Sequence, residues 1–352
     1  MKIHARNSLL AAFLILLLVS LSCDFAANTL GDNAQTQPLQ LPPTRAAGSE
    51  DSGQQPEDAL ESPAVEPPAT GAAPATAVPP AVTAEMDCEE DICVSSGTFL
   101  LQRPIAPSGR AAIDNSIRFG SYARNLKAAR HGVSFINSTG TPVLAAADGT
   151  VVVAGNDAST PYGPYTNYYG NLVILEHQLP ELSEPLYTVY GHLSEVSVKS
   201  GQTVQAGQEI GRVGSSGDIA GSALAFEVRY GANDYNDARN PELWMAVQND
   251  DGGQPFGALA GSVMNAAGRY LTVENIVIER LAGKGQRALD TYYLKTYAED
   301  RLKGVQPWGE SFAMGSLPAG AYQITFYNGP DLVQREVQIE PGQLTVVKIT
   351  VP

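Results

Sequence analysis

The chain has 352 residues, of which 43% are hydrophobic, so it is long enough to form two ordinary domains together with segments that do not fold. Its formal net charge is −15, and no stretch gathers basic residues into a stripe, which argues against nucleic acid as a partner. Residues 26 to 91 hold twelve acidic residues and one basic residue, Arg45, so the remainder of the chain is only mildly acidic.

The amino end has the layout of an export signal. Two basic residues precede an unbroken apolar run from Leu9 to Val19, and small and polar residues then lead to Cys23. Since a membrane-spanning helix needs roughly 20 apolar residues, this run is too short for a retained anchor. The stretch from Val19 to Cys23 resembles a bacterial lipobox. This resemblance implies a lipoprotein signal peptide over residues 1–22, a lipid on Cys23, and an exported protein that is anchored to a membrane and faces its extracytoplasmic side.

A segment of biased composition follows. Residues 26 to 86 are rich in Pro, Ala, Thr and Gln, contain no aromatic residue and hold ten of the 24 prolines of the chain. Such a composition cannot bury enough apolar surface to fold. We therefore expect residues 23–86 to form a lipidated, disordered tether, although an insertion that is merely tolerated predicts the same flexibility.

The cysteine count is consistent with export. With Cys23 assigned to the lipid, only Cys88 and Cys93 remain, and in an exported chain an even remainder favours a disulfide. We predict this bridge within a short segment, residues 87–100. Two free thiols are the alternative, whereas a zinc site is disfavoured because no further Cys or His follows nearby.

Turn residues and alternating hydrophobicity then predict β structure nearly throughout residues 101–263. Thr141–Ala147 runs into Asp148-Gly149, a strong hairpin signal, and Thr150–Val153 returns. One short helix is expected over Asn240–Met245, packing Trp244 against a sheet. Further strands are expected at Leu172–Glu176, Tyr187–Tyr190, around Val204, and at Ile210–Val213.

A second β unit is predicted over residues 264–352, with its clear part starting near Leu271. Its last three strands are expected at Ala321–Tyr327, Gln334–Ile339 and Thr345–Val351, each alternating apolar and polar residues as in a half-buried antiparallel sandwich. The stretch Phe312–Val351 resembles the carboxypeptidase-regulatory or transthyretin-like accessory domains of exported proteins.

The middle unit resembles the lysostaphin/LytM-type zinc metalloendopeptidases, which cut peptide crosslinks in bacterial cell walls. The resemblance implies an all-β, two-sheet domain, similar to a duplicated hybrid motif, with a groove for peptide. The segments that carry it are Gly132-Val133, Gly140–Val143, Gly170–Ile174, Tyr187–Leu193, Val198–Val213 and Phe226–Arg229.

The same alignment implies that the catalytic centre is degenerate. In this family an HxxxD motif supplies two zinc ligands, and the second His of an HxH motif supplies the third. These metal positions correspond to Arg130, Ser134 and Ala225, while the two catalytic His positions correspond to Ala223 and His192. Arginine and alanine offer no lone pair to a metal and a neutral hydroxyl is a poor zinc ligand, so we expect neither a bound cofactor nor catalysis.

Regrouped histidines are a weaker alternative. A slip of one residue would make His131 the first ligand but would put Phe135 at the carboxylate position. We expect His131 to point away from the groove floor and His177 to lie beyond its strand end near the groove rim. Together with His192 they are interpreted as surface or supporting residues, because three histidines in so large a domain seldom form a site.

Two further features have competing interpretations. His192 could donate a hydrogen bond to a peptide in the groove, but we favour a structural role in which it satisfies a loop carbonyl. Glu227 and Arg229 lie two apart on a predicted strand and so share a face, where a surface ion pair is expected rather than chemistry.

Three functions remain open at this stage. The first is a membrane-tethered pseudo-peptidase that binds or regulates at the cell wall, with peptidoglycan stem peptides or a cell-wall hydrolase as candidate partners. The second is an active zinc endopeptidase with non-standard ligands. The third is a structural surface lipoprotein whose β domains space or scaffold other exported components.

Overall fold

The computed structural model describes residues 86–97, 99–116, 118–122, 129–248, 253–283, 287–302 and 308–352. The signal peptide, Cys23 and the tether therefore lie outside the described residues. All of the described residues belong to one compact unit. In the part that is described, no helix is both long and apolar enough to cross a membrane.

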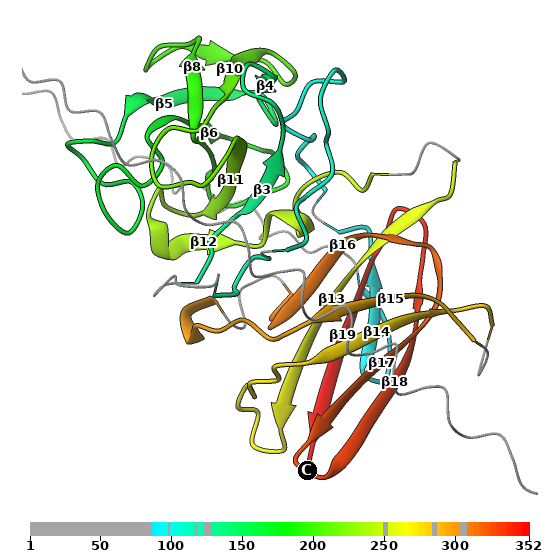
Figure 1. Cartoon of the computed structure of the whole chain (residues 1–352). Helices are drawn as coiled ribbons and strands as arrows, with labels where there is room; N and C mark the ends of the chain where they lie inside the picture. Colours follow the sequence, from blue (N-terminus) through cyan, green and yellow to red (C-terminus); the bar gives the residue numbers. More distant parts are fainter. Residues whose placement is uncertain are drawn as a thin grey trace, which may run out of the picture. The chain divides into compact units, whose positions relative to one another are not determined.

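The first β domain is built from two sheets (Figure 1). A seven-stranded sheet has the order β12-β11-β7-β6-β5-β9, with β3 pairing β11, and a three-stranded sheet has the order β4-β10-β8. The all-β prediction and the two-sheet architecture are thus confirmed. The strands are β3 (Val133–Ile136), β4 (Pro142–Leu144), β5 (Gly149–Asn156), β6 (Asn171–His177), β7 (Leu186–Gly191), β8 (Leu193–Val196), β9 (Thr203–Val204), β10 (Glu209–Val213), β11 (Ala223–Tyr230) and β12 (Ala238–Arg239).

Apolar side chains from both sheets form one core. Val143 of the small sheet and Val151, Leu175, Tyr190 and Phe226 of the large sheet have no solvent exposure and belong to the same cluster. Burying such side chains contributes about 1.5–3 kcal/mol each, which is what holds the two sheets face to face.

The predicted hairpin at Asp148-Gly149 is wrong. Strand β4 pairs with β10 in the small sheet, whereas β5 pairs with β6 and β9 in the large sheet. The turn instead carries the chain from one sheet to the other, because Ala145, Ala146 and Ala147 are all buried between them. The Asp148 carboxylate fixes this crossover by accepting the backbone N–H of Ala206 at 2.7 Å.

The short helix predicted after the large sheet is present as one 3₁₀ turn, η2 (Pro241–Leu243). The Asn240 side chain caps it by accepting the backbone N–H of Glu242, and proline occupies its first position. Trp244 is 3% exposed and its ring lies 5.9 Å from that of Tyr230 on β11, as predicted. Two other 3₁₀ helices are η1 (Tyr235–Asp237) and η3 (Asp300–Leu302).

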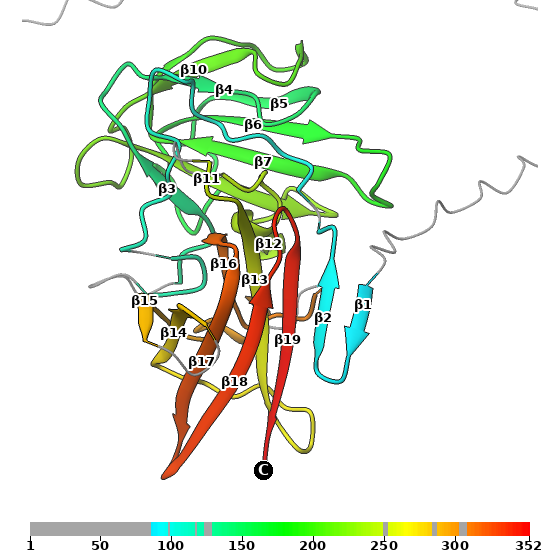
Figure 2. The same cartoon turned by 90° about the vertical axis from the view of Figure 1, so that its right-hand side faces the viewer.

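The second β domain is a sandwich of two sheets (Figure 2). One has the order β1-β2-β19-β13-β16 and the other β15-β14-β17-β18. The last three predicted strands are confirmed. The strands are β1 (Met86–Glu89), β2 (Ile92–Ser95), β13 (Phe256–Asn265), β14 (Ile276–Leu281), β15 (Ala288–Leu294), β16 (Phe312–Pro318), β17 (Gly320–Asn328), β18 (Asp331–Ile339) and β19 (Leu344–Val351).

This sandwich takes strands from both ends of the folded chain. Strand β13 pairs in parallel with β19, so the expected boundary between residues 263 and 264 falls inside a strand of the sandwich. The segment of residues 87–100 contributes β1 and β2, which extend the same sheet beyond β19. The resemblance to carboxypeptidase-regulatory domains stays a prediction.

The predicted disulfide is confirmed. Cys88 and Cys93 lie directly opposite each other in the register of β1 and β2, with their Cα atoms 4.0 Å apart and their sulfur atoms bonded. The bridge therefore staples the two strands at the outer end of the sheet.

Candidate functional site

Three neighbouring strands bring the positions of the expected metal ligands together. Ser134 on β3 lies directly opposite Ala225 on β11, and Ala225 lies opposite Gly191 at the end of β7. Arg130 precedes β3, and its Nη2 donates a hydrogen bond of 2.7 Å to Ser134 Oγ. Directly opposite residues have Cβ atoms about 5 Å apart, so these three side chains share one site.

The donor set at this site does not fit a zinc ion. Ser134 and Ala225 are 8% and 7% exposed, and the Arg130 guanidinium donates a hydrogen bond to the serine hydroxyl. A fixed positive charge repels a dication, and alanine has no donor atom. Elsewhere, too, no three His, Cys, Asp or Glu side chains of the described ranges lie close enough together to hold a metal.

The two catalytic positions lie beside this site. Ala223 pairs with Ile136 on β3 and is bridged to Gly214. It is the first residue of β11 and lies two residues before Ala225, on the same face of the strand. His192 follows directly after Gly191, the residue opposite Ala225, and has a left-handed backbone with φ of 64°. Of the family's functional positions, only His192 therefore carries a titratable ring.

The His192 ring has a structural partner. It is 1% exposed, its Nδ1 is 2.9 Å from the carbonyl oxygen of Ser216, and its backbone N–H donates to the carbonyl of Tyr169 at 2.8 Å. Burial lowers the pKa of His192, and the nearby positive charge of Arg130 lowers it further. The ring is therefore neutral at pH 7, and the structural interpretation of His192 is the one that its geometry supports.

His131 belongs to a different environment from Arg130. Its ring is 1% exposed, stacks on Tyr235 with centroids 3.8 Å apart, and its Nδ1 lies 2.6 Å from the Tyr235 carbonyl oxygen. Its Nε2 is 3.8 Å from a carboxylate oxygen of Glu299. Burial is the main cause of the lowered pKa of His131. The ring supports the chain after Arg130 and shares no partner with it.

The expected place of His177 is wrong. It is the last residue of β6, has no solvent exposure, and is held between the Asp148 carbonyl at 2.7 Å and the Thr188 hydroxyl at 2.8 Å. His177 pairs with Leu186 at the start of β7, whereas His192 follows the end of that strand. The two rings therefore lie at opposite ends of β7.

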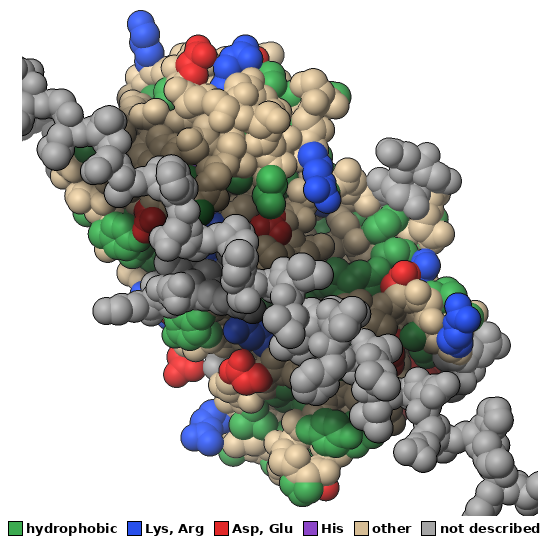
Figure 3. Space-filling model, in the orientation of Figure 1, with side chains coloured by type: hydrophobic (Ala, Val, Ile, Leu, Met, Phe, Trp, Pro, Cys, Tyr) green, Lys and Arg blue, Asp and Glu red, His purple; other side chains and the backbone are tan. Residues whose placement is uncertain are grey.

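Of the two roles expected for the three histidines, surface or supporting, the structure excludes the surface role, since His131, His177 and His192 are each 1% exposed or less. Figure 3 agrees, because no histidine side chain of the described residues is visible on the face that it draws. Each ring found a carbonyl acceptor inside the protein, a pairing that residue spacing alone does not reveal.

The ion pair of Glu227 and Arg229 exists, but its expected exposure is wrong. Arg229 Nη2 lies 3.0 Å from Glu227 Oε2, and the residues are 3% and 0% exposed. The Tyr169 hydroxyl donates to Glu227 Oε1 at 2.5 Å, and Arg229 Nη2 also donates to the Tyr162 carbonyl at 2.8 Å. The pair thus ties the interior of β11 to the loop between β5 and β6.

That loop carries functional-site residues that the sequence reasoning missed. The Asp157 carboxylate accepts the backbone N–H groups of Tyr169 and Gly170 at 2.8 and 2.9 Å, which fixes the loop end. Tyr168 is buried, and its ring centroid lies 6.5 Å from that of His192, so the ring lies beside the candidate site. Tyr165 hydrogen-bonds Asp218 on the facing loop. The sequence signal that could have pointed to this loop is its four tyrosines between residues 162 and 169.

These features define a class: a two-sheet β domain whose β3, β11 and β7 strands converge on the place of a metallopeptidase centre. Residues 128–239 match the model of peptidase family M23, and this part of the chain is a domain of that family.

The relatives share the domain rather than the whole protein. A 99-residue match, 37% identical, to cell division protein DipM of Caulobacter vibrioides covers 28% of this chain and 14% of DipM. A 108-residue match, 36% identical, to murein hydrolase activator NlpD of Escherichia coli covers 31% of this chain and 25% of NlpD. The catalytic domain of lysostaphin from Staphylococcus simulans aligns with 27% identity and a TM-score of 0.31, over 37% of this chain and 89% of that domain. The match thus spans a quarter or less of the two curated relatives' own length.

Proposed function

We propose that this protein is an extracytoplasmic, membrane-tethered pseudo-peptidase that acts as a binding or regulatory module at the bacterial cell wall. A domain of family M23, with relatives that include a murein hydrolase activator, implies a regulatory or hydrolytic role connected with the wall. The choice of the regulatory role is our own inference from the site.

One observation supports a regulatory rather than a hydrolytic role. At the convergence of β3 and β11, the Arg130 guanidinium donates to Ser134 Oγ at 2.7 Å, and Ala225 lies directly opposite Ser134. A side chain with a permanent charge and a side chain without a donor atom stand where metal ligands would be needed. No hydrolytic step through a metal can be derived from these residues.

The loop beside this site has an exposed aromatic residue that suits binding. Tyr165 is 46% exposed, its hydroxyl donates to Asp218, and its ring packs edge-on against Tyr168, so an apolar surface with a polar tip is open to a partner. The candidate partners are peptidoglycan stem peptides or a wall hydrolase, and the name of NlpD favours the hydrolase.

The tether and the lipid on Cys23 belong to the proposal as well. They rest on the lipobox-like sequence and on the Pro-rich composition of residues 26 to 86. A tether of this kind would keep both β domains close to a membrane.

The proposal is tested with dye-labelled sacculi and the purified exported chain. Alone, the protein should release no dye, while it should raise the release by a purified wall amidase or endopeptidase severalfold, or bind sacculi in a sedimentation assay. Release by the protein alone that a chelator abolishes would contradict the proposal, as would the absence of both binding and stimulation.

A further inference from the structure

The two sheets of the carboxy-terminal sandwich end at different places. The first sheet continues past β19 through β2 to β1, whereas the second sheet ends at β18. Strand β18 packs over β19 and β13. Among the described strands, none of the second sheet covers the β1–β2 hairpin, which therefore overhangs the sandwich core (Figure 2).

The uncovered face of this hairpin is both apolar and acidic. Asp87 lies opposite Val94 and Glu89 lies opposite Ile92 in the β1–β2 register, so these four side chains share one face. The disulfide occupies the alternate positions and so faces the other side. Ile92 packs at the margin of the sandwich core but stays partly exposed, as does Val94.

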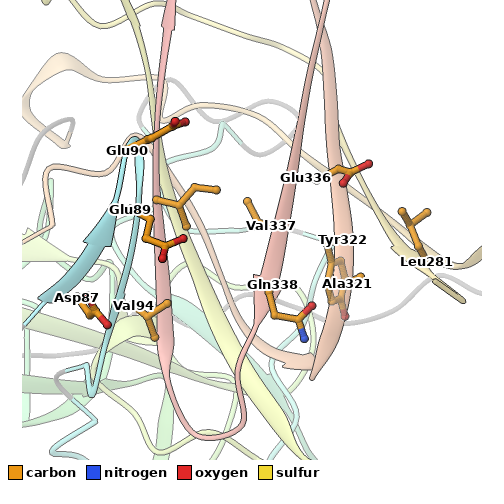
Figure 4. A pocket seen from close by; sticks show the side chains of 11 residues that line it. Asp87, Glu89, Glu90, Val94, Leu281, Ala321, Tyr322, Glu336, Val337 and Gln338 are labelled. Carbon is orange, nitrogen blue, oxygen red and sulfur yellow. The ribbon is translucent and has the colours of Figure 1, made fainter. Parts of the chain in front are cut away.

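An open groove runs along this face. Its cavity volume is about 1020 Å³, with the hairpin on one side and β17 and β18 on the other. Figure 4 shows Glu89 and Glu90 along the first wall and Glu336 and Gln338 along the second. Four carboxylates line the groove together with aliphatic side chains, and among the described residues that line it there is no lysine, arginine or histidine.

The second wall also offers a strand edge. Strand β18 is the last strand of its sheet, and an edge strand presents N–H and C=O groups that another chain can pair with. Near its end, the Gln338 carbonyl already accepts the Thr345 hydroxyl at 2.8 Å, so the usable edge lies before Gln338. Space for one more strand thus exists beside β18 and above Ile92 and Val94.

The negative charge of the groove favours a basic peptide as its ligand. The chain's own segment from residue 26 to 85 carries eight acidic residues and one arginine, so like charges would oppose its entry. An extended segment with lysine or arginine is complementary. Side chains on one face of a strand recur about every 6.7 Å, which allows alternate residues to meet carboxylates and aliphatic groups in turn.

We propose that this groove receives an extended, basic peptide segment of a partner protein. The segment pairs with β18 as an additional strand, covers Ile92 and Val94 with its apolar side chains, and places its basic side chains against Asp87 and Glu89. This mode of recognition is strand addition at an exposed edge, in which the backbone supplies affinity and alternate side chains supply specificity. It concerns a surface of the sandwich and is independent of the function proposed for the M23 domain.

The test uses the full exported chain and a fluorescent peptide, Lys-Thr-Val-Thr-Lys-Thr-Val-Thr, whose Lys and Val side chains share one face. Fluorescence anisotropy at about 0.05 M salt should detect binding that weakens as salt rises. A peptide with Glu in place of Lys should bind at least about tenfold more weakly. The double variant Asp87→Asn, Glu89→Gln should raise the Kd about three- to tenfold, the size expected for two partly exposed ion pairs.

Two controls make the result specific. The variant Glu181→Gln, Glu274→Gln removes two exposed carboxylates outside the groove and away from β18, and should leave the Kd within about twofold. Peptides N-methylated at alternate residues should bind in one register and not in the other, because only one set of N–H groups faces β18.

Equal affinity for the Lys and Glu peptides, equal affinity for both N-methylated registers, or no binding of the Lys peptide at about 1 mM would each overturn the proposal. A dimer of the chain that the Lys peptide does not dissociate would overturn it too, because the occupant would then be a second copy.

Discussion

At the scale of single residues, the side chains around Arg130 form a connected local structure. Arg130 lies close enough to His192 for its positive charge to lower the pKa of that ring. Its own hydrogen bond to Ser134 satisfies a hydroxyl that is 8% exposed between two strands. One charged side chain thus contacts Ser134 and influences His192 at the same site.

The buried pair of Glu227 and Arg229 makes a sharp stability prediction. Removing one partner leaves a charge without compensation in the interior, so Glu227→Gln or Arg229→Met should each lower the free energy of unfolding by about 3–5 kcal/mol. The double variant should lose less than the sum of the two. Urea unfolding measures all three values, and single variants within about 0.5 kcal/mol of the parent protein would show that the pair is not held as described.

Glu310 makes a prediction about pH. This carboxyl is 3% exposed, and burial raises its pKa to about 8. The folded state therefore keeps the proton between about pH 5 and 8 while the unfolded state releases it, so the contribution of Glu310 to stability falls as pH rises through this range, by at most about 1.4 kcal/mol per pH unit.

Glu310→Gln should remove this dependence, so its stability relative to the parent protein should increase from pH 5 to pH 8. The buried histidines have lowered pKa values and therefore reduce stability as pH falls below about 6.5. Both proteins contain these histidines, so their contribution cancels when the two stabilities are subtracted. Parallel stability curves in urea across this pH range would contradict the assignment.

At the scale of elements, alternation was a reliable guide where one face of a strand is buried. Strands β17 and β18 and the second half of β19 alternate between core and solvent, and all three strands were predicted. Alternation fails for β6 and β11, whose residues are buried on both faces, and the polar residues Glu227 and His177 were therefore assigned to the surface.

The pairing of strands that are distant in the chain could not be predicted from the sequence, for a different reason. A turn signal such as Asp148-Gly149 specifies a local reversal but not the sheet that each flanking strand joins, and here the two strands join different sheets. Likewise, the parallel pairing of β13 with β19 joins residues about eighty positions apart, and no local pattern encodes it. For the candidate site, motif positions located Arg130, Ser134 and Ala225, while the tyrosine loop and the partners of the histidines needed the fold.

The disulfide makes a prediction at this scale. Cys88→Ser with Cys93→Ser should destabilise the β1–β2 hairpin by about 2 kcal/mol, because the bridge closes a short loop at the edge of a sheet. Hydrogen exchange should speed up at the paired amides of β1 and β2 and remain unchanged in the M23 domain, for example in β6. A uniform increase in exchange across both domains would contradict the view that the hairpin is an edge element.

At the scale of the whole described unit, the sandwich is attached to the M23 domain next to the segment that holds Arg130. The Ala298 N–H donates to the Gly120 carbonyl at 2.7 Å, and Glu299 Oε1 accepts the Ala129 N–H at 2.8 Å, one residue before Arg130. On the other side, Arg103 donates to the Ser316 hydroxyl at 2.8 Å. The accessory domain thereby holds the segment that presents Arg130.

The central claim is that the M23 site of this protein lacks the donors for a metal, and metal analysis of the purified chain after dialysis against zinc-containing buffer tests it most directly. The parent protein should retain far less than about one zinc ion per chain, whereas the variant Arg130→His, Ser134→Asp, Ala225→His, which restores three ligands at converging positions, should retain about one. Circular dichroism verifies that the variant is folded. Zinc bound by the parent protein at about one ion per chain, and removed by a chelator, would contradict the claim.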